Sequence, residues 1–366
     1  MSDFIPGLEL SRLFYIEVVK PILEADFPDL RYSAALIGGG SEVLGFDTEM
    51  SADHDWGTRL MIFLEEDDFT EYREIIDQTL RRKLPYKFCE YSTNFGLPDP
   101  DDNGTQLLED IEEGTVNHRV EILTIRGFFL DYFNFDLLEP IEPADWLTFQ
   151  EQKLRTITTG AVYHDEIGLC EMLNKFVYYP KDVWLYLLAS GWNRIGQEEH
   201  LMGRAGSVGD EIGSAIVAAR LVRDLMRLCF LMEKQYAPYA KWFGKAFSQL
   251  NCAEKLSPVF KKVLSAETWQ EREKFLAQAY EYVAEMHNAL EITEPLSAKV
   301  GRFFSRPFLV MNLEGNFDGA ICKCITDPKV KRIAEKKLVG SVDQFSDSTD
   351  ILAEPQWRTV LRKLYE

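Results

Sequence analysis

Residues 38–60, GGGSEVLGFDTEMSADHDWGTRL, contain the features that decide the fold. They follow the apolar run YSAALI (residues 32–37) and overlap the run DWGTRLMIFLEE (residues 55–66), which is rich in branched and aromatic side chains. Short apolar runs of this kind, separated by glycines and polar residues, are typical of strands. The stretch therefore predicts a strand, a glycine turn, a short helix and a second strand, within a mixed α+β fold.

Two aspartates stand at the head of the second predicted strand. Gly40 and Ser41 are followed, after eleven further residues, by Asp53-His54-Asp55. Because side chains alternate along a strand, Asp53 and Asp55 are expected to face the same side. Two adjacent carboxylates repel one another unless a cation lies between them, and carboxylate oxygens suit Mg²⁺ or Mn²⁺. The pattern predicts a divalent-metal site.

The glycines before Ser41 predict a phosphate-binding loop. Gly39 and Gly40 have no side chain, so the backbone can approach a ligand closely, and the N–H groups at the start of a following helix favour anions. Mg²⁺ is usually held by one or two carboxylates together with the phosphates of a substrate. Gly39, Gly40 and Ser41 are therefore our candidates for binding the phosphates of a nucleotide.

A third carboxylate is expected on a neighbouring strand. In the run HRVEILTI, Glu121 stands between two apolar residues whose side chains face the opposite way. A charge in so apolar a strand needs a functional reason. Three carboxylates around two metal ions suit an in-line displacement at phosphorus. We therefore predict Asp53, Asp55 and Glu121 as metal ligands and catalytic residues.

At these positions the sequence resembles the nucleotidyltransferase superfamily of polymerase-β-like and small antibiotic-modifying enzymes. The signature of that family is a glycine followed by Gly or Ser, a spacer of similar length, two acids flanking one residue, and a third acid on a later strand. The matching residues are Gly40, Ser41, Asp53, Asp55 and Glu121. The resemblance implies that the two aspartates bind both metal ions, that Glu121 supports the ion that activates the acceptor oxygen, and that the glycine loop binds the β- and γ-phosphates.

One position departs from that signature, since His54 stands where the family usually has an apolar residue.

The later, helical part of the chain also resembles a family of uncharacterised bacterial proteins that carry the same catalytic head. This second resemblance implies no substrate. It rests on the segments DVWLYLLASGWNRIGQEEH, GDEIGSAIVAARLVRDLMRLCFLMEKQYAPY and GSVDQFSDSTDIL.

Each half of the metal-site pattern has a simpler explanation when it is taken alone. A GGGS run also occurs in flexible turns, and an Asp-His-Asp sequence also occurs at solvated strand ends. The two together, with Glu121 where a third acid is expected, favour the metal site.

The periodicity of the apolar residues changes near Pro140. Before this point helical segments alternate with short strand-like runs, and after Asp145 apolar residues recur three and four apart almost everywhere. Mixed patterning returns from about Leu296. The expected domains are a nucleotidyltransferase catalytic domain over residues 1–140, an all-α helical bundle over residues 141–295, and a mixed C-terminal extension over residues 296–366.

Two helices of the predicted bundle carry further candidates. Arg220 and Arg223 lie on one helix face and are our candidates for holding the triphosphate, because two metal ions do not neutralise all of its oxygens. A solvated stripe that pairs with surplus acids is the alternative. On the preceding helix, Glu198 lies on an apolar stripe and is our candidate general base. Glu199 is nearly as good a candidate, and ordinary surface exposure is the alternative for both.

The C-terminal run GSVDQFSDSTDIL has a higher density of polar residues than an ordinary loop. It offers Asp343, Gln344 and Asp347 as side chains for a binding site. A turn built from Asx and Ser motifs explains the same composition equally well.

The balance of charge restricts the partners. The chain has 366 residues, of which 40 are basic and 60 acidic, so its net charge is −20. This excess works against binding nucleic acid, whose affinity for proteins comes mainly from Lys and Arg, and it favours a small neutral or cationic acceptor.

The chain shows no basic segment followed by an apolar one at its start and no uncharged run long enough for a membrane span. We expect a cytoplasmic protein without a membrane partner.

These patterns predict an enzyme that transfers a nucleoside monophosphate from a nucleoside triphosphate, with ATP expected, to a small hydroxyl-bearing acceptor, with release of pyrophosphate. Mg²⁺ or Mn²⁺ is the expected cofactor. Two alternatives stay open: transfer to a tRNA end or a protein side chain, and an antitoxin-like module that binds a nucleotide or a partner without turnover. The acceptor and the oligomeric state do not follow from the sequence.

Overall fold

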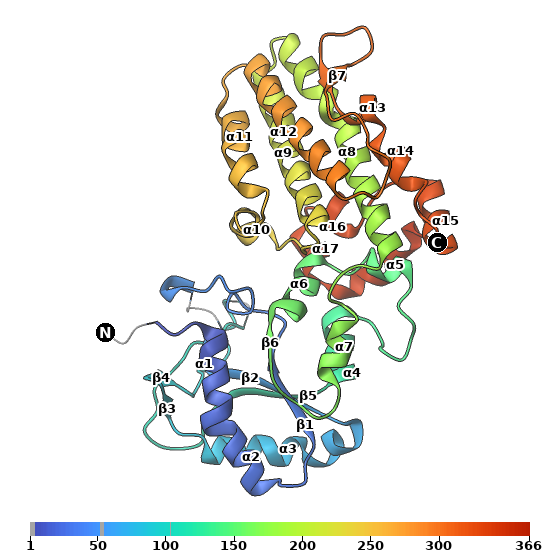
Figure 1. Cartoon of the computed structure of the whole chain (residues 1–366). Helices are drawn as coiled ribbons and strands as arrows, with labels where there is room; N and C mark the ends of the chain where they lie inside the picture. The colour runs from blue at the N-terminus through green and yellow to red at the C-terminus, as the bar shows by residue number, and fades with distance from the viewer. Residues whose placement is uncertain (1–3, 52–54, 103) are drawn as a thin grey trace. The chain divides into compact units, whose positions relative to one another are not determined.

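The fold is α+β, as the sequence predicts. The computed structural model describes residues 4–51, 55–102 and 104–366 and contains a four-stranded mixed sheet together with many helices (Figure 1). None of the helices in these three ranges combines the length and the apolar character that a membrane crossing requires.

The chain divides into two compact units, whereas three domains were expected. Unit 1 comprises Met1–Pro140 and Lys153–Val177, and unit 2 comprises Ile141–Gln152 and Tyr178–Glu366. Residues 296–366, which were expected as a mixed C-terminal extension packed on the other two domains, belong to unit 2.

Strand pairing and helix packing explain this division. The second segment of unit 1 contains strand β6 (Ala161–Asp165), which pairs with β1 (Tyr32–Leu36). In unit 2, helix α14 (Phe317–Cys322) from the C-terminal region packs along the long helix α8 (Lys181–Ser207). Neither pairing is visible as a local pattern in the sequence.

Unit 1 contains the sheet and the helices that pack on it. Besides β1 and β6, its elements are α1 (Gly7–Phe14), a π-helical turn (Tyr15–Val19), α2 (Lys20–Asp26), a 3₁₀ turn (Glu49–Ser51), β2 (Arg59–Leu64), α3 (Glu66–Lys83), β3 (Lys87–Phe88), β4 (Tyr91–Ser92), β5 (Arg119–Thr124), α4 (Ile125–Phe133) and α7 (Leu169–Asn174). Helix α6 (Glu151–Thr159) contributes residues to both units.

The sheet has the strand order β5-β2-β1-β6. Strand β1 is antiparallel to both of its neighbours, and β2 is parallel to β5. Every residue of β2 is buried, as expected for a central strand covered on both faces, while β5 alternates between buried and half-buried residues because it lies at an edge. The sheet therefore presents β5, with Glu121, at its margin.

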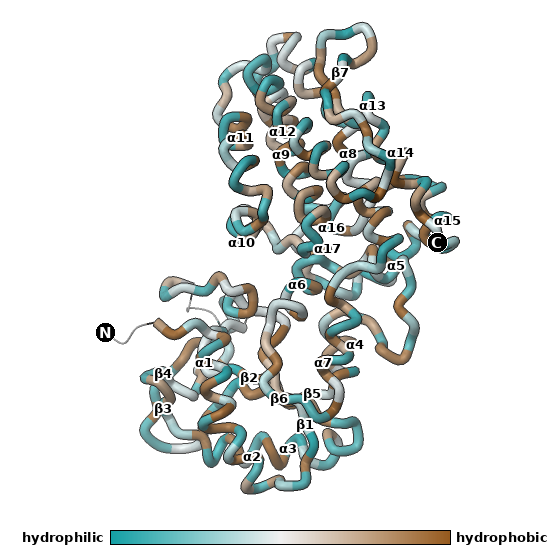
Figure 2. The backbone as a smooth tube through the Cα atoms, in the orientation of Figure 1, coloured by the Kyte–Doolittle hydropathy of each residue, from teal (hydrophilic) through white to brown (hydrophobic). Residues whose placement is uncertain are grey.

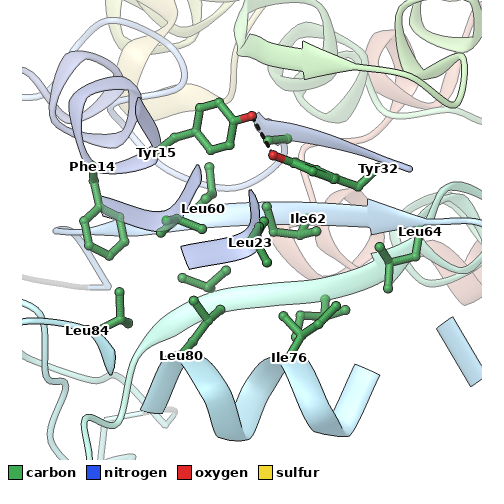
Figure 3. Packing of buried hydrophobic residues seen from close by; sticks show 14 of the residues in the cluster. Phe14, Tyr15, Leu23, Tyr32, Leu60, Ile62, Leu64, Ile76, Leu80 and Leu84 are labelled. Carbon is green, nitrogen blue, oxygen red and sulfur yellow. Dashed lines mark hydrogen bonds between the residues drawn. The ribbon is translucent and has the colours of Figure 1, made fainter. Parts of the chain in front are cut away.

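The main core of unit 1 lies on one face of this sheet. Figure 3 shows apolar side chains from the first two helices, from the strands and from α3 meeting there. The hydroxyl groups of Tyr15 and Tyr32 are 3.0 Å apart within this core, so each polar tip has a partner. Helix α3 contributes the fully buried Ile76 and Leu80, and its acidic first turn and basic last turn suit the helix dipole.

One local expectation for unit 1 was wrong. Residues 161–165 form β6, although they lie in the range that was expected to be an all-α helical bundle. Their pairing with β1, which is distant in the sequence, overrides the local pattern. The polar stretch after Ser41 forms turns and a short 3₁₀ helix at Glu49–Ser51, in agreement with the expected short helix.

Unit 2 is mostly helical. Its long helices show alternating brown and teal segments in Figure 2, as expected for helices that bury one face. Besides α8 and α14, its elements are α5 (Pro143–Trp146), α9 (Glu211–Met232), α10 (Ala240–Phe247), α11 (Ala253–Ser265), α12 (Trp269–Ala289), β7 (Gly301–Arg302), β8 (Leu309–Val310), α13 (Asn312–Gly315), α15 (Pro328–Lys336), α16 (Val342–Phe345), α17 (Thr349–Ala353), a 3₁₀ turn (Pro355–Trp357), α18 (Arg358–Leu361) and a second 3₁₀ turn (Arg362–Leu364).

The core of unit 1 can be tested with a matched pair of substitutions in α3. Leu80 is fully buried and Ile75 is 50% exposed. Leu80→Ala should lower the free energy of unfolding by about 2–5 kcal/mol, because it leaves a cavity under the sheet. Ile75→Ala should lower it by about 1 kcal/mol or less. Hydrogen exchange at the β2 amides measures both changes within unit 1. Equal effects of the two variants would contradict the assigned core.

Candidate functional site

The loop after β1 depends on glycine at two positions. Gly38 and Gly40 have φ angles of 84° and 137°, which other residues rarely adopt. A Cβ atom on Gly40 would also lie 2.5 Å from Oε2 of Glu42. A Cβ atom on Gly39 would meet nothing within 4 Å. The backbone of the loop is therefore open to a ligand at Gly39.

Three consecutive backbone N–H groups in this loop are available for hydrogen bonding. Those of Gly39, Gly40 and Ser41 donate to no acceptor within the described residues, and all three residues are at least partly exposed. Ser41 begins a turn, in which its carbonyl oxygen accepts the N–H of Phe46 at 3.0 Å. Any phosphate contact here would therefore come from loop amides and not from the helix N-terminus expected from the sequence.

Arg59, the first residue of β2, joins this loop to the segment that carries Asp55. Its Nη1 donates to Oε1 of Glu42 at 2.9 Å and to the backbone oxygen of Asp55 at 3.0 Å. Its Nη2 donates to the backbone oxygen of Gly39 at 3.1 Å. One guanidinium therefore fixes Gly39 close to Asp55, with a planar geometry that a lysine does not have.

The ion pair between Arg59 and Glu42 is buried. Their side chains are 10% and 4% exposed, respectively. Burial raises the pKa of the Glu42 carboxyl, and the charge of Arg59 acts against this shift. Sequence reasoning missed both residues. The signal available for Arg59 was its position as a charged residue directly before the apolar run LMIFL.

Asp55 has a left-handed backbone conformation, with φ of 52°. Its carboxylate forms an ion pair with Arg119, and Oδ1 accepts the backbone N–H of Gln106 at 3.1 Å. The carboxylate is still accessible, since the side chain of Asp55 is 40% exposed. Asp53 and His54 lie outside the described residues.

Asp55 lies in a loop and not at the head of a strand, because β2 begins at Arg59. The next residue, Trp56, is fixed through its Nε1, which donates to Oδ2 of Asp47 at 3.1 Å. The same oxygen accepts the backbone N–H of Gly7 at 2.6 Å, at the start of α1. Asp47 therefore anchors the loop beside Asp55, and no pattern in the sequence pointed to this contribution.

Glu121 lies in the edge strand β5, in register with Met61 of β2, and Arg119 lies in register with Arg59. Because side chains alternate along β5, Arg119 and Glu121 share one face of the sheet. Glu121 also lines a pocket of about 550 Å³ between β5 and α3. Glu121 therefore lies two residues along β5 from Arg119, which pairs with Asp55.

The described residues contain no group of three His, Cys, Asp or Glu side chains arranged to hold a metal ion. Of the three predicted ligands, Asp55 and Glu121 are among these residues and Asp53 is not. The chemistry of the donors suits a hard divalent cation, because each offers carboxylate oxygens.

In unit 2, Glu198 and Arg220 form an ion pair with each other. The second carboxylate oxygen of Glu198, Oε2, is buried and has no hydrogen-bond partner among the described residues. Glu199 is buried, and its carboxylate accepts the backbone N–H groups of Met311 at 2.6 Å and Leu313 at 3.0 Å. Glu199 therefore caps the start of α13, which accounts for a buried carboxylate at that position.

Arg223 belongs to a network of charged side chains on α8, α9 and the C-terminal run. It pairs with Asp347, and its Nη2 lies 3.4 Å from Oδ1 of Asp224. Oδ2 of Asp224 accepts a hydrogen bond from Nε of Arg194 at 2.8 Å. Arg223, like Arg220, therefore has a carboxylate partner within unit 2.

Asp343 and Gln344 of the C-terminal run are buried. Oδ2 of Asp343 accepts the backbone N–H of Glu151 at 2.9 Å, and Nε2 of Gln344 donates to the backbone oxygen of Leu187 at 3.0 Å. The carboxylate of Glu151 accepts the backbone N–H of Ala237 at 2.8 Å. Burial, together with the neighbouring charge of Asp343, raises the pKa of Glu151 to about 7. These contacts attach the run to the bundle.

Known proteins share only limited similarity with this chain. The family model described as a domain of unknown function (DUF4037) matches residues 146–243, which is less than half of the chain. No curated protein matches the chain. Among solved structures, a nucleotidyltransferase-like protein from Exiguobacterium sibiricum is similar over 85% of each chain, with 10% sequence identity and a TM-score of 0.31. A similarity this distant supports no function.

The contribution of the buried ion pair can be measured with a double-mutant cycle. Arg59→Met leaves the charge of Glu42 buried without its partner and should lower the free energy of unfolding by about 3–5 kcal/mol. Adding Glu42→Gln to this variant should restore part of that loss, because no unpaired charge then remains. Urea unfolding of the two single variants and the double variant gives the coupling energy. Strictly additive effects would contradict the ion pair.

The raised pKa of Glu151 predicts a pH dependence of stability. Folding favours protonated Glu151, so the stability of the native chain should fall as the pH rises from about 4.5, the ordinary value, to about 7. Glu151→Gln keeps the acceptor oxygen for Ala237 but does not ionise. The variant should therefore gain stability relative to the native chain as the pH is raised from 5 to 8, measured by urea unfolding. A constant difference between the two proteins would contradict the assignment.

Proposed function

We propose that unit 1 binds a nucleoside triphosphate and transfers its nucleoside monophosphate to a small hydroxyl-bearing acceptor. The acceptor oxygen forms a bond to the α-phosphorus, the bond from that phosphorus to the α–β bridging oxygen breaks, and pyrophosphate leaves. The acceptor proton passes to a base. The proposed reaction needs a phosphate-binding loop beside a carboxylate.

The observation that carries this proposal is the position of Arg59. Its guanidinium binds the backbone oxygens of Gly39 and Asp55 at 3.1 and 3.0 Å. The same side chain therefore holds the glycine loop and the segment that contains Asp55. These two segments are the ones that the sequence pattern assigned to phosphate and metal binding. A phosphate held at one segment would lie within reach of a cation held at the other.

The glycine loop would bind the phosphates through its backbone. The N–H groups of Gly39, Gly40 and Ser41 have no acceptor in the described parts of the chain. Charge-assisted hydrogen bonds from N–H groups to phosphate oxygens are short and strong. The open space beside Gly39 leaves room for such a ligand. The loop therefore supports binding of the β- and γ-phosphates.

Asp55, with Asp53 and Glu121, would hold Mg²⁺ or Mn²⁺. The exposed carboxylate of Asp55 offers oxygen ligands of the kind that these cations prefer. When bound, the metal would supply charge stabilisation for the attacking and leaving oxygens. Arg119 pairs with Asp55 and neutralises its charge, so the arginine would have to give up part of this contact to a cation.

The proposed roles of three residues in unit 2 stay predictions. Glu198 is our candidate base for the acceptor hydroxyl, and Arg220 and Arg223 are our candidates for binding the triphosphate. Each of them has an ion-pair partner inside unit 2. The net charge of −20 supports a small neutral or cationic acceptor rather than a polynucleotide.

One observation favours a second candidate function. The ion pair between Asp55 and Arg119 gives the predicted metal ligand a permanent positive partner within the protein. A module that binds a nucleotide or a partner without turnover would retain such a pair, since it needs no catalytic metal. Nucleotide binding without release of pyrophosphate would support this candidate.

The enzyme proposal is tested by Asp55→Asn. This change removes a charged metal ligand and should reduce Mg²⁺-dependent release of pyrophosphate by about a thousandfold or more, because metal-assisted stabilisation contributes several kcal/mol. Asp101→Asn is the matched control, since Asp101 is also an exposed loop residue of unit 1. The assay uses labelled ATP, CTP, GTP and UTP with total tRNA, a protein lysate and a metabolite and aminoglycoside library offered separately.

The outcomes distinguish the candidates. If calorimetry detects no binding of any nucleoside triphosphate with Mg²⁺ or Mn²⁺, the nucleotide site is refuted. Binding without turnover across all acceptors refutes the enzyme and supports the binding module. Label on tRNA at physiological salt, and on nothing small, refutes the small acceptor.

A further inference from the structure

A separate pocket of about 520 Å³ lies within unit 2. It is formed by one face of α8, by the segment that follows α15 and by the last residue of α16. A volume of this size is typical of small-molecule sites. Its lining includes Asn193, Arg194, Gln197, Lys337, Leu338 and Phe345.

The two ionisable residues that line this pocket are both cations. Lys337 is exposed, and its ammonium group has no partner among the described residues. Arg194 uses its Nε to bind Asp224 at 2.8 Å, and its two terminal nitrogens have no hydrogen-bond acceptor in the described chain. Asp224 is 3% exposed at its side chain and is shared with Arg223, so its charge is already paired. Arg194 and Arg223 together balance the carboxylates of Asp224 and Asp347, so Lys337 supplies the unpaired positive charge of the pocket lining.

The uncharged side chains of the pocket suit the rest of a ligand. Leu338 and Phe345 are half-buried and offer apolar surface. Asn193 is held in place on both sides, because its Nδ2 donates to Asp318 at 2.9 Å and its Oδ1 accepts from Gln197 at 2.7 Å. Apolar surface with a few fixed polar and cationic groups is the general pattern of small-molecule sites, and the two cations suit an anionic ligand.

We propose that this pocket binds a small organic anion. Its phosphate or carboxylate group contacts Arg194 and Lys337, and its apolar body packs on Leu338 and Phe345. A guanidinium and an ammonium group both form charge-assisted hydrogen bonds with such oxygens. The pocket lies entirely in unit 2, and its lining includes none of the residues assigned to the proposed nucleotide site.

The experiment is calorimetric titration of the full chain with phenyl phosphate, benzoate and the neutral benzyl alcohol. Saturable binding of phenyl phosphate or benzoate is expected, and the stronger of the two identifies the anionic group. Benzyl alcohol should bind at least tenfold more weakly. Lys337→Gln should weaken binding of the anion at least tenfold, while Lys336→Gln, at an exposed neighbouring position of α15, should leave it unchanged. Lys337 is substituted in preference to Arg194, because a change of Arg194 would also remove its hydrogen bond to Asp224.

Two further titrations locate the ligand. Phe345→Ala should weaken binding of phenyl phosphate and leave binding of inorganic phosphate unchanged, since the latter has no apolar body. Asp55→Asn should change neither, which separates this site from the proposed nucleotide site. The proposal is overturned if neither phenyl phosphate nor benzoate binds saturably, if benzyl alcohol binds as tightly, or if the Lys337 and Lys336 variants behave alike.

Discussion

The arrangement of the candidate site depends on the buried ion pair between Arg59 and Glu42. The arginine stands at the start of the central strand β2 and binds one carboxylate and two backbone oxygens at once. Burying two charges is costly, and the mutual attraction offsets that cost when the remaining donors are also satisfied. The three acceptors of Arg59 meet this condition, and they attach two loops to the rigid sheet.

This attachment gives a definite structure to loops that are poor in regular hydrogen bonds. Gly40 leaves room for the carboxylate of Glu42, and a Cβ atom on Gly39 would meet nothing within 4 Å. Asp47 supplies a second attachment next to Asp55, through the indole of Trp56. Preorganised donors of this kind bind a charged ligand with little loss of conformational freedom. The account of unit 1 as a nucleotide site rests on that preorganisation.

Much of the fold could be predicted from local patterns, and much of the site could not. The buried strand β2 is a continuous apolar run, so its prediction as a strand is confirmed. Strand β6 was missed because its pairing with β1 involves residues far apart in the sequence. The glycines and Asp55 follow from a spacing, whereas the contacts of Arg59 exist only after folding. The buried position of Glu199 likewise depends on a distant backbone segment, at the start of α13.

The most direct test of the central claim is a crystal structure with Mn²⁺ and a non-hydrolysable ATP analogue, measured with anomalous scattering. The account predicts a manganese peak at the carboxylate of Asp55, with phosphate oxygens on the N–H groups of Gly39 to Ser41 and the contacts of Arg59 intact. A nucleotide bound elsewhere, with Asp55 still paired to Arg119 and no manganese beside it, would contradict the account.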